Sequence, residues 1–393
     1  MSAPRVAIVG SGPAALMAAT RLAARGVPAT LFEKRKSPGR KLLVAGSSGL
    51  NISNSLPLAE FAAHYSPHPD DPKFWQRVIG AFPPAQWIEF IESLGVPTFE
   101  GTSGRYFIED MKASRFLQSW IKHLTTHGIE IQTGFECTAI TPQTRTLGFS
   151  DGSEQSFDAI LFALGGGSWE PTEVPLRWPT LFKDLAFASF ESSNCGYRVD
   201  WPVKFTQEAA GKPLKKIIAT SKRAKRPGDA MATDYGIEGP PIYFAGMTGE
   251  ITLDLRPDLT EQQILEKLQA VRENLSPIRR VKKTLSLCDA SLALVFHLSP
   301  KEVLNGSDLT PIAQRIKKFP LTLLGPQPLT EAISSSGGLS LGELDSEFMI
   351  KKWPGIYAAG EMLDWDVPTG GFLLQACVAQ GAIAGDAIAA RLK

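Results

Sequence analysis

Residues 5–33 read RVAIVGSGPAALMAATRLAARGVPATLFE, and this segment sets the architecture that we expect for the chain. An apolar run ends at Gly10, an alanine-rich stretch with one apolar helical face covers residues 14–25, and a second apolar run over 27–32 ends at Glu33. The order is strand, glycine turn, helix, strand and acid. Within about thirty residues, this order is typical of a unit that binds a dinucleotide.

The chemistry of dinucleotide binding explains each part of this unit. Gly10 permits the tight turn, Gly12 lets the backbone approach a pyrophosphate, and Ala15 is small enough for the helix to pack closely on the sheet. The helix N-terminus offers free N–H groups and the positive end of its dipole to the phosphates. Glu33 would accept hydrogen bonds from ribose hydroxyls. The predicted contacts in this unit are Gly10, Gly12, Pro13, Ala14, Ala15, Glu33 and Lys34.

Two later segments favour FAD as the dinucleotide. Residues 158–167 form an apolar strand that ends in glycines, and residues 355–361 form another that ends in a glycine and an acid, before a small-residue helix over 372–391. FAD enzymes of the two-dinucleotide-binding type show this tripartite pattern. The acid would hold ribityl or phosphate oxygens, and the last helix would direct its positive end at the flavin. The contacts predicted from these segments are Ala163, Gly165, Gly360 and Glu361.

Four further motifs lie outside these segments or extend them. They are residues 39–54 (GRKLLVAGSSGLNISN), 104–107 (GRYF), 360–372 (GEMLDWDVPTGGF) and, more weakly, 233–240 (TDYGIEGP). With them the chain resembles the HI0933-like flavoproteins, also called the BaiN/RdsA-like NAD(P)/FAD-dependent oxidoreductases, over most of its length. It departs from that family at Gly49 and Leu50, which replace Arg and Cys, and over residues 170–179, which replace a glycine-rich run. These departures indicate a divergent subfamily.

The resemblance implies FAD, oxidoreductase activity and an FAD domain interrupted by an insertion. Arg40 and Lys41 would contact the FAD phosphates or the flavin edge, or else form a solvated basic turn. Ser47, Ser48 and Asn51 would bond the isoalloxazine ring or the ribityl chain, or else only shape a turn. Glycines before the last helix would let backbone N–H groups reach the flavin. The residues at that point are Thr369, Gly370, Gly371 and Phe372.

Three residues are weak candidates for a catalytic role, and the catalytic group itself stays unknown at this point. Arg105 would anchor a substrate, with a structural salt bridge as the alternative. Asp234 and Tyr235 would donate a proton near a substrate, with an ordinary loop position as the alternative. No second glycine fingerprint follows a strand. A nicotinamide donor, NAD(P)H, would therefore dock transiently against the flavin, or another donor would serve.

The fold class expected is α/β, a Rossmann-like FAD-binding domain interrupted by a β-barrel-like and helical subdomain. The FAD domain would comprise residues 1–195 and 331–393, and the insertion residues 196–330, with its β part over 196–258 and its helical part over 259–330. The insertion holds 20 lysines and arginines against 14 aspartates and glutamates, a net charge of +6, and the remainder holds 21 against 26, a net charge of −5. Its basic clusters are residues 222–226, 279–283 and 315–318.

Composition excludes several classes of protein. An apolar fraction of 43% and a charged fraction of 21% over 393 residues are those of a globular chain, and the formal net charge of +1 argues against wholesale polyanion binding. The four cysteines are widely separated, so we expect neither a disulfide scaffold nor a metal site. No uninterrupted apolar run is long enough to cross a membrane, and we expect a cytoplasmic protein.

Three functions remain open on the sequence. The first is a flavin-dependent oxidoreductase that delivers a hydride to an electron-poor C=C bond of a small molecule. The second is an enzyme that reduces a base in RNA, with the basic insertion holding the phosphates. The third is a protein that keeps FAD as a structural element and acts by binding a partner without turnover.

Overall fold

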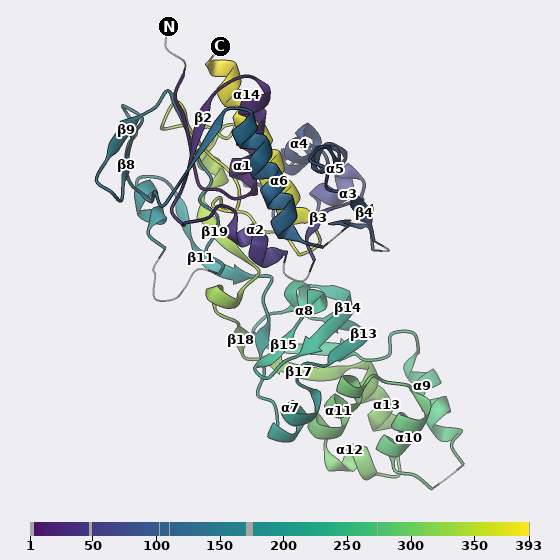
Figure 1. Ribbon diagram of the computed structural model, residues 1–393. Helices are drawn as coiled ribbons and strands as arrows, with labels where there is room; N and C mark the ends of the chain where they lie inside the picture. The colour runs from purple at the N-terminus through teal and green to yellow at the C-terminus, as the bar shows by residue number, and fades with distance from the viewer. Residues whose placement is uncertain are drawn as a thin grey trace. The chain divides into compact units, whose positions relative to one another are not determined.

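The computed structural model describes residues 4–46, 49–101, 103–109, 111–169, 176–272 and 274–392. The chain divides into two compact units (Figure 1). Unit 1 comprises Met1–Glu191 and Ile333–Lys393, and unit 2 comprises Ser192–Ala332. The assignment of unit 2 to a substrate or a partner stays a prediction.

A five-stranded parallel sheet forms the centre of unit 1. Its order is β20 (Ile356–Ala358), β10 (Ala159–Phe162), β1 (Val6–Val9), β2 (Ala29–Glu33) and β6 (Ile129–Thr133). All four residues of β1 and of β10 are buried, as expected for central strands with both faces covered. The predicted Rossmann-like fold is therefore confirmed, and all five strands end at one edge of the sheet.

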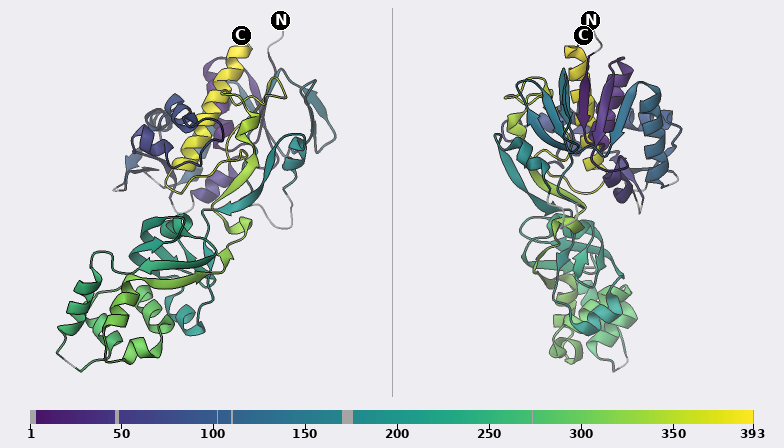
Figure 2. Two further views of the ribbon diagram at one scale, coloured as in Figure 1. Left: turned by 180° about the vertical axis from the view of Figure 1, so that it is seen from behind. Right: turned by 60° about the vertical axis from the view of Figure 1, so that its left-hand side comes forward.

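Helices α1 (Pro13–Ala24), α6 (Ala113–Thr126) and α14 (Phe372–Arg391) cover one face of this sheet (Figure 1). Small residues let α1 and α14 approach closely. A Cβ on Gly381 would lie 2.2 Å from the carbonyl oxygen of Ala14, and one on Gly385 would lie 2.7 Å from that of Ala18. By length and composition α14 is the one helix among the described residues that could cross a membrane, but it is 83% buried inside the fold. Figure 2 shows it, in yellow, running through unit 1.

Smaller elements complete unit 1. The sheet β3–β5–β4 and the helices α2 to α5 follow β2 in the chain, and the meander β7–β8–β9 leads from β6 to β10. A two-stranded sheet, β11–β19, is formed by segments on either side of unit 2 in the chain. The bounds are α2 (Arg40–Ala45), β3 (Asn51–Asn54), α3 (Leu58–Ala62), α4 (Phe74–Ala81), α5 (Pro84–Ser93), β4 (Thr98–Glu100), β5 (Arg105–Ile108), β7 (Cys137–Thr141), β8 (Thr146–Phe149), β9 (Glu154–Ser156), η1 (Trp178–Phe182), β11 (Phe187–Ser193), β19 (Ser334–Leu339) and η3 (Leu341–Glu343).

Unit 2 is built on a seven-stranded antiparallel sheet of order β17-β16-β13-β14-β15-β12-β18. The first and last strands in this order are separated by one residue, Leu324, whose N–H donates to the carbonyl of Arg198 at 2.8 Å. The chain therefore passes directly from one end of the sheet to the other, and the sheet is almost a barrel. This confirms the β-barrel-like subdomain. The strands are β12 (Tyr197–Arg198), β13 (Pro213–Thr220), β14 (Lys225–Ala232), β15 (Gly236–Glu238), β16 (Gly249–Asp254), β17 (Phe319–Leu323) and β18 (Gly325–Pro326).

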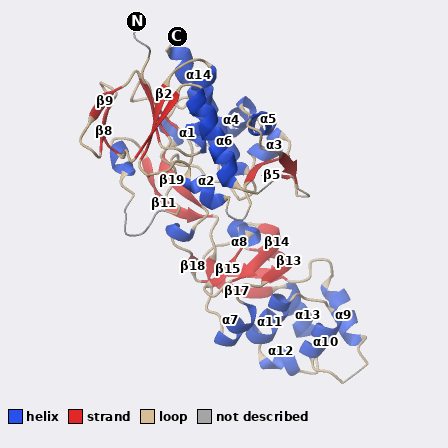
Figure 3. Ribbon diagram, in the orientation of Figure 1, coloured by secondary structure: helices blue, strands red, loops and turns tan. Residues whose placement is uncertain are grey.

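The helices of unit 2 lie mainly beyond one face of this sheet, with α8 on the other (Figure 3). Helix α9 begins with a capping box, in which Thr260 and Gln263 each bond the other's backbone N–H through their side chains. The helices bury a second apolar core, separate from that of unit 1. Their bounds are α7 (Val203–Ala209), α8 (Pro240–Ala245), α9 (Glu261–Gln269), α10 (Pro277–Thr284), α11 (Asp289–Leu298), α12 (Lys301–Asn305), α13 (Thr310–Lys317) and η2 (Leu329–Glu331).

Candidate functional site

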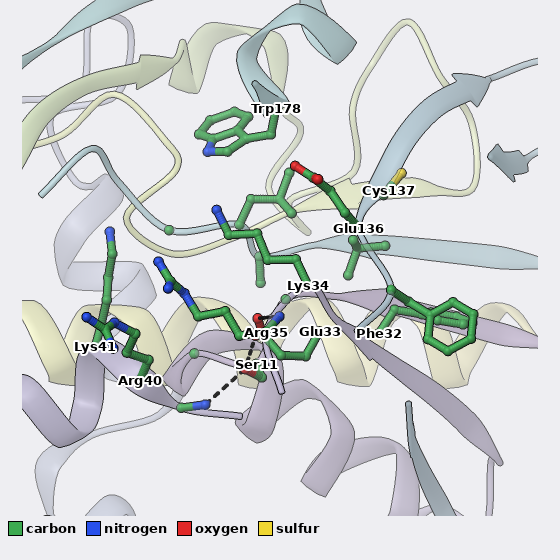
Figure 4. A pocket seen from close by; sticks show the side chains of 18 of the residues that line it. Ser11, Phe32, Glu33, Lys34, Arg35, Arg40, Lys41, Glu136, Cys137 and Trp178 are labelled. Atoms are coloured by element: carbon green, nitrogen blue, oxygen red, sulfur yellow. Dashed lines mark hydrogen bonds between the residues drawn. The ribbon is translucent and has the colours of Figure 1, made fainter. Parts of the chain in front are cut away.

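A groove opens in unit 1 at the carboxyl edge of β1, β2 and β10 (Figure 4). Because these strands are parallel, the residues that follow each of them meet there. The groove collects predicted contacts from segments that lie far apart in the sequence. Those that line it are Gly10, Gly12, Glu33, Lys34, Arg40, Lys41, Ala163 and Gly165.

The two glycines of the first turn play different structural roles. Gly10 has a φ of 107°, and a Cβ there would lie 2.2 Å from the carbonyl oxygen of Ala163, so this position accepts only glycine. A Cβ on Gly12 would meet no atom of the described residues within 4 Å. Gly12 therefore faces open space at the start of α1. That helix has neither a side-chain cap nor an acid in its first turn, which leaves its backbone donors available to an anion.

Glu33 lies at the base of the groove with its carboxylate already fixed. One oxygen accepts a hydrogen bond from the hydroxyl of Ser11, and the other accepts from the N–H of Arg35 at 2.8 Å. The Ser11 hydroxyl in turn accepts from the N–H of Gly39 at 2.9 Å. Ser11 was not among the predicted contacts, although it lies inside the glycine motif. It joins the first turn to the start of α2 and orients Glu33.

Lys41 and Glu361 hold the turn that follows β10. Lys41 donates to the carbonyl of Gly166 at 2.7 Å, and its Nζ lies 4.0 Å from a Glu361 carboxylate oxygen. Glu361 accepts from the N–H groups of Gly166 and Ser335, at 3.4 and 3.1 Å. Both side chains therefore have a structural role without any ligand. Contact with a cofactor remains a prediction for each of them.

The N-terminus of α14 lies against β3. Gly370 and Gly371 have φ values of 137° and 88°, and a Cβ on Gly371 would lie 2.4 Å from the carbonyl oxygen of Ser53. It would also lie 2.7 Å from Oδ1 of Asn51, a buried oxygen with no hydrogen-bond partner in the described part of the chain. Tyr65 donates its hydroxyl to the carbonyl of Phe372 at 2.7 Å. The uncapped helix start and the free Asn51 oxygen fit a polar ligand at this end of unit 1.

Other predicted contacts are not among the residues that line the groove. Pro13, Ala14 and Ala15 form the first turn of α1. Gly360 donates its N–H to the side chain of Gln380 at 2.7 Å, which joins the end of β20 to α14. Two more predicted contacts, Ser47 and Ser48, lie outside the described residues. Thr369 precedes Gly370 and Gly371, the two glycines before α14.

The three weak catalytic candidates do not share one unit. Arg105 begins β5 in unit 1, whereas Asp234 and Tyr235 lie between β14 and β15 in unit 2. Asp234 is exposed, and the Tyr235 hydroxyl donates to the carboxylate of Glu238 at 2.6 Å. Burial and then Glu238 raise the pKa of Tyr235 well above its ordinary value. Tyr235 is therefore protonated at neutral pH.

Groove residues from two other elements were missed by sequence reasoning. Phe135, Glu136 and Cys137 come from the start of β7, and Arg177 and Trp178 from the start of η1. Neither segment carries a motif, so their position depends on the folded sheet. Burial raises the pKa of Cys137 to about 12, which keeps this thiol protonated at neutral pH.

The basic clusters of unit 2 are divided between structural and exposed side chains. Arg280 donates to the carbonyls of Leu268, Val271 and Leu275 at 2.7 to 2.9 Å. Arg315 bonds Ser299 and a main-chain carbonyl, and Lys317 pairs with Asp254 at 2.7 Å. The exposed members at the start of β14, called here the basic hairpin, are Lys222, Arg223, Lys225 and Arg226.

Comparison with known proteins identifies relatives over the whole chain. The family described as HI0933-like protein Rossmann domain matches residues 4–387. The 3-dehydro-bile acid delta(4,6)-reductase of Clostridium scindens is 24% identical and covers 98% of this chain and 99% of its own. The ribosomal RNA dihydrouridine synthase of Escherichia coli is 23% identical and covers 98% of each chain.

A solved structure shares the fold. The 3-ketosteroid-delta4-(5alpha)-dehydrogenase of Rhodococcus jostii aligns with a TM-score of 0.53 at 12% identity, over 98% of this chain and 96% of its own. At this identity the likeness concerns the architecture alone.

Proposed function

This chain belongs to the HI0933-like family of FAD-dependent oxidoreductases, and we propose that it reduces an electron-poor C=C bond conjugated to a carbonyl group. The observation that supports the flavin chemistry of this proposal most directly is the groove of unit 1. There an open glycine turn, an uncapped helix N-terminus and a fixed carboxylate meet, together with cationic side chains. When bound, the reduced flavin would supply the hydride.

Residues of the groove and of the N-terminal end of α14 match the parts of FAD in turn. The backbone at Gly12 leaves room for the pyrophosphate, and the first turn of α1 supplies donors to it. The Glu33 carboxylate, oriented by Ser11, would accept from the adenosine ribose. Asn51 and the start of α14 would hold the polar edge of the flavin.

The names of the relatives support the class of substrate. One relative is named for reducing 3-dehydro-bile acids at delta(4,6), and another for making dihydrouridine in ribosomal RNA. A 3-oxo steroid with a delta(4) bond and a uracil ring both carry a C=C bond conjugated to a carbonyl. A hydride adds to the β-carbon of such a bond and a proton to the α-carbon, so a proton source is needed beside the substrate. We retain Arg105, Asp234 and Tyr235 as candidates for anchoring the substrate or returning that proton.

Anaerobic spectroscopy of the purified protein tests this proposal. We expect bound FAD, identified by mass spectrometry after release, and bleaching of its visible absorption by NADH or NADPH. A 3-oxo-delta(4) steroid should then restore the oxidised spectrum. A flavin that is photoreduced but that neither a steroid enone nor a uracil substrate reoxidises would contradict the proposal and favour a protein that binds FAD without turnover. The absence of reduction by either nicotinamide would show that another donor serves.

A second candidate substrate is RNA, and the exposed basic hairpin favours it. Lys222, Arg223, Lys225 and Arg226 are exposed within a segment where the nearest acid, Asp229, bonds the N–H of Lys216 at 2.7 Å. Four contacts to phosphates would make binding strongly dependent on salt, with a slope of about −3 in log K against log [salt] for single strands.

Neutralising the basic hairpin tests this second candidate. Replacing its four cations by alanine should weaken binding of a ribosomal RNA fragment about tenfold or more at low salt and flatten the salt dependence. The control is Lys282→Ala together with Lys283→Ala, two exposed cations of α10. If both proteins bind the RNA equally, or neither binds it, the hairpin is not an RNA-binding surface.

A further inference from the structure

Trp178 lines the same groove, although neither a motif nor the family pattern points to it. It lies within residues 170–179, the segment by which the chain departs from the glycine-rich run of its relatives. Its side chain is only 7% exposed. Figure 4 shows the indole ring across the cavity from Ser11 and Glu33.

The indole nitrogen of Trp178 has no hydrogen-bond partner among the described residues. An indole N–H is a donor only, and a buried donor without an acceptor is unfavourable in a folded protein. The nearby cationic side chains of the groove cannot accept a hydrogen bond. Its two carboxylates among the described residues are Glu33, which is already bonded by Ser11 and Arg35, and Glu136, which is half-buried and does not accept from Trp178. Among the described residues, no atom accepts from the indole N–H of Trp178, a residue that lines the groove.

Aromatic packing fixes the orientation of this donor. The Trp178 ring meets Phe182, Phe187 and Phe190 edge to face, with ring centroids 5.6 to 5.7 Å apart. Phe182 in turn packs on Phe162 of the central strand β10, at 5.1 Å. The indole is thus attached through one phenylalanine to the parallel sheet, and its N–H is held in place before any ligand arrives.

The position of Trp178 assigns it to one half of a dinucleotide. η1 packs against β7, whose first residue, Cys137, lines the groove beside Glu33. The loop before β7 is joined to β2 by a bond from the N–H of Phe135 to the carbonyl of Glu33, at 3.0 Å. Lys41 lines the groove as well, but its contacts are with Gly166 and Glu361, on the side of β20. Trp178 thus lies across the groove from Glu33, the acid that we propose binds the ribose.

We infer that Trp178 is a cofactor-binding residue, which donates its indole N–H to an acceptor atom in the adenosine half of the bound FAD. The acceptor is a ring nitrogen of the adenine or an oxygen of its ribose or phosphate. The inference rests on the proposed binding of FAD. It adds a contact from a segment in which this chain differs from its family.

Substitution of Trp178 by phenylalanine tests the inference, because it removes the N–H and keeps an aromatic ring among the three phenylalanines. In titrations of the apoprotein followed by flavin fluorescence, Trp178→Phe should raise the Kd for FAD about 5- to 10-fold, the effect of one lost hydrogen bond. The matched control is Trp353→Phe. Trp353 is equally buried and stacks on the same Phe182, at 5.7 Å, but does not line the groove. The substitution Trp353→Phe should leave the Kd for FAD within about twofold of that of the wild-type protein.

A second measurement uses ADP, which carries the adenosine half alone. In nuclear magnetic resonance spectra of protein with ¹⁵N-labelled tryptophan, the indole signal that is lost in Trp178→Phe should shift when ADP binds the wild-type protein. The inference is overturned if that signal does not move, if Trp178→Phe binds FAD as tightly as the wild-type protein, or if Trp353→Phe weakens binding equally. If the wild-type protein binds neither FAD nor ADP, the proposed function itself fails. Loss of all binding by the wild-type protein can be distinguished from the other outcomes, in which the wild-type protein binds FAD and only the contact of Trp178 is disproved.

Discussion

The sheets of the two units place their functional side chains differently. In unit 1 the strands are parallel, so the residues that follow β1, β2 and β10 meet at one edge and form a groove from distant segments. In unit 2 the strands are antiparallel, and neighbouring strands end at opposite edges. Consecutive cations there have different surroundings. Arg280 is bonded to three carbonyls, whereas its neighbour Arg279 is exposed.

This difference determines what a sequence motif predicts about the position of its residues in each unit. In unit 1 a motif at a strand end predicts a position in the groove, because the topology collects all such ends. In unit 2 a run of basic residues does not predict a basic surface, because an arginine that satisfies carbonyls at a helix end is part of the scaffold. Three experiments test the comparison, from the largest expected effect to the smallest.

The largest effect is expected at the glycine turn of unit 1. Gly10→Ala places a Cβ 2.2 Å from the carbonyl oxygen of Ala163 at a φ of 107°, which should lower the free energy of unfolding by about 3 kcal/mol or more. The Cβ of Gly12→Ala meets no described residue within 4 Å, so this variant should leave the apoprotein as stable as the wild type, to within about 0.5 kcal/mol.

The same pair of substitutions separates folding from binding. The methyl group of Gly12→Ala would occupy the space offered to the pyrophosphate, and the Kd for FAD should rise about tenfold or more. Thermal unfolding of the two apoproteins and fluorescence titration with FAD measure both quantities. If Gly12→Ala bound FAD as tightly as the wild type, the groove would not be the dinucleotide site.

In unit 2 the corresponding test is the structural arginine. Arg280→Met keeps much of the aliphatic length but leaves the carbonyls of Leu268, Val271 and Leu275 without this donor. We expect a loss of about 2 kcal/mol in the free energy of unfolding, measured with urea. Arg279→Ala, at the adjacent exposed position, should change it by less than about 0.5 kcal/mol. If both variants lost the same free energy of unfolding, Arg280 would have no structural role that its exposed neighbour Arg279 lacks.

The smallest effect concerns the ion pair that joins α1 to α14. Asp386 accepts from Arg21 at 2.7 and 2.9 Å and from Arg25 at 2.9 Å. Burial raises the pKa of this carboxyl, but the hydrogen bonds and charges of the two arginines outweigh it, and the pKa is lower than usual. Because these side chains are about one third exposed, Asp386→Asn should cost about 1 kcal/mol at pH 7.

Acid should remove this difference. A carboxyl with a lowered pKa stabilises the folded state above its ordinary pKa of about 4, and the contribution is lost as the pH falls through the lower folded value. Urea unfolding between pH 7 and pH 3 should therefore show the wild type and Asp386→Asn converging below about pH 4. If the difference in the free energy of unfolding between the two proteins stayed constant across this pH range, a lowered pKa of Asp386 would be contradicted.

Local sequence patterns predicted much of unit 1 because the physical causes are local there. The turn at Gly10, the strand that ends at Glu33 and the helix over 372–391 each depend on spacing within a few residues. The same is true of the strands at 159–162 and 356–358. The hydrogen-bond partners of the side chains could not be predicted in this way. Neither the Ser11 bond to Glu33 nor the Lys41 bond to Gly166 follows from periodicity.

The sequence by itself determined the parallel Rossmann-like sheet, the insertion within it and the residues that close its first turn. Their causes are hydrophobic period, glycine conformation and helix dipoles, which act over short stretches of chain. Only the tertiary structure showed that Trp178 lines the groove with an N–H that no described residue accepts, and that Arg280, Arg315 and Lys317 belong to the scaffold. A hydrogen bond depends on which distant atom the folded chain brings within about 3 Å, and no local pattern encodes that distance.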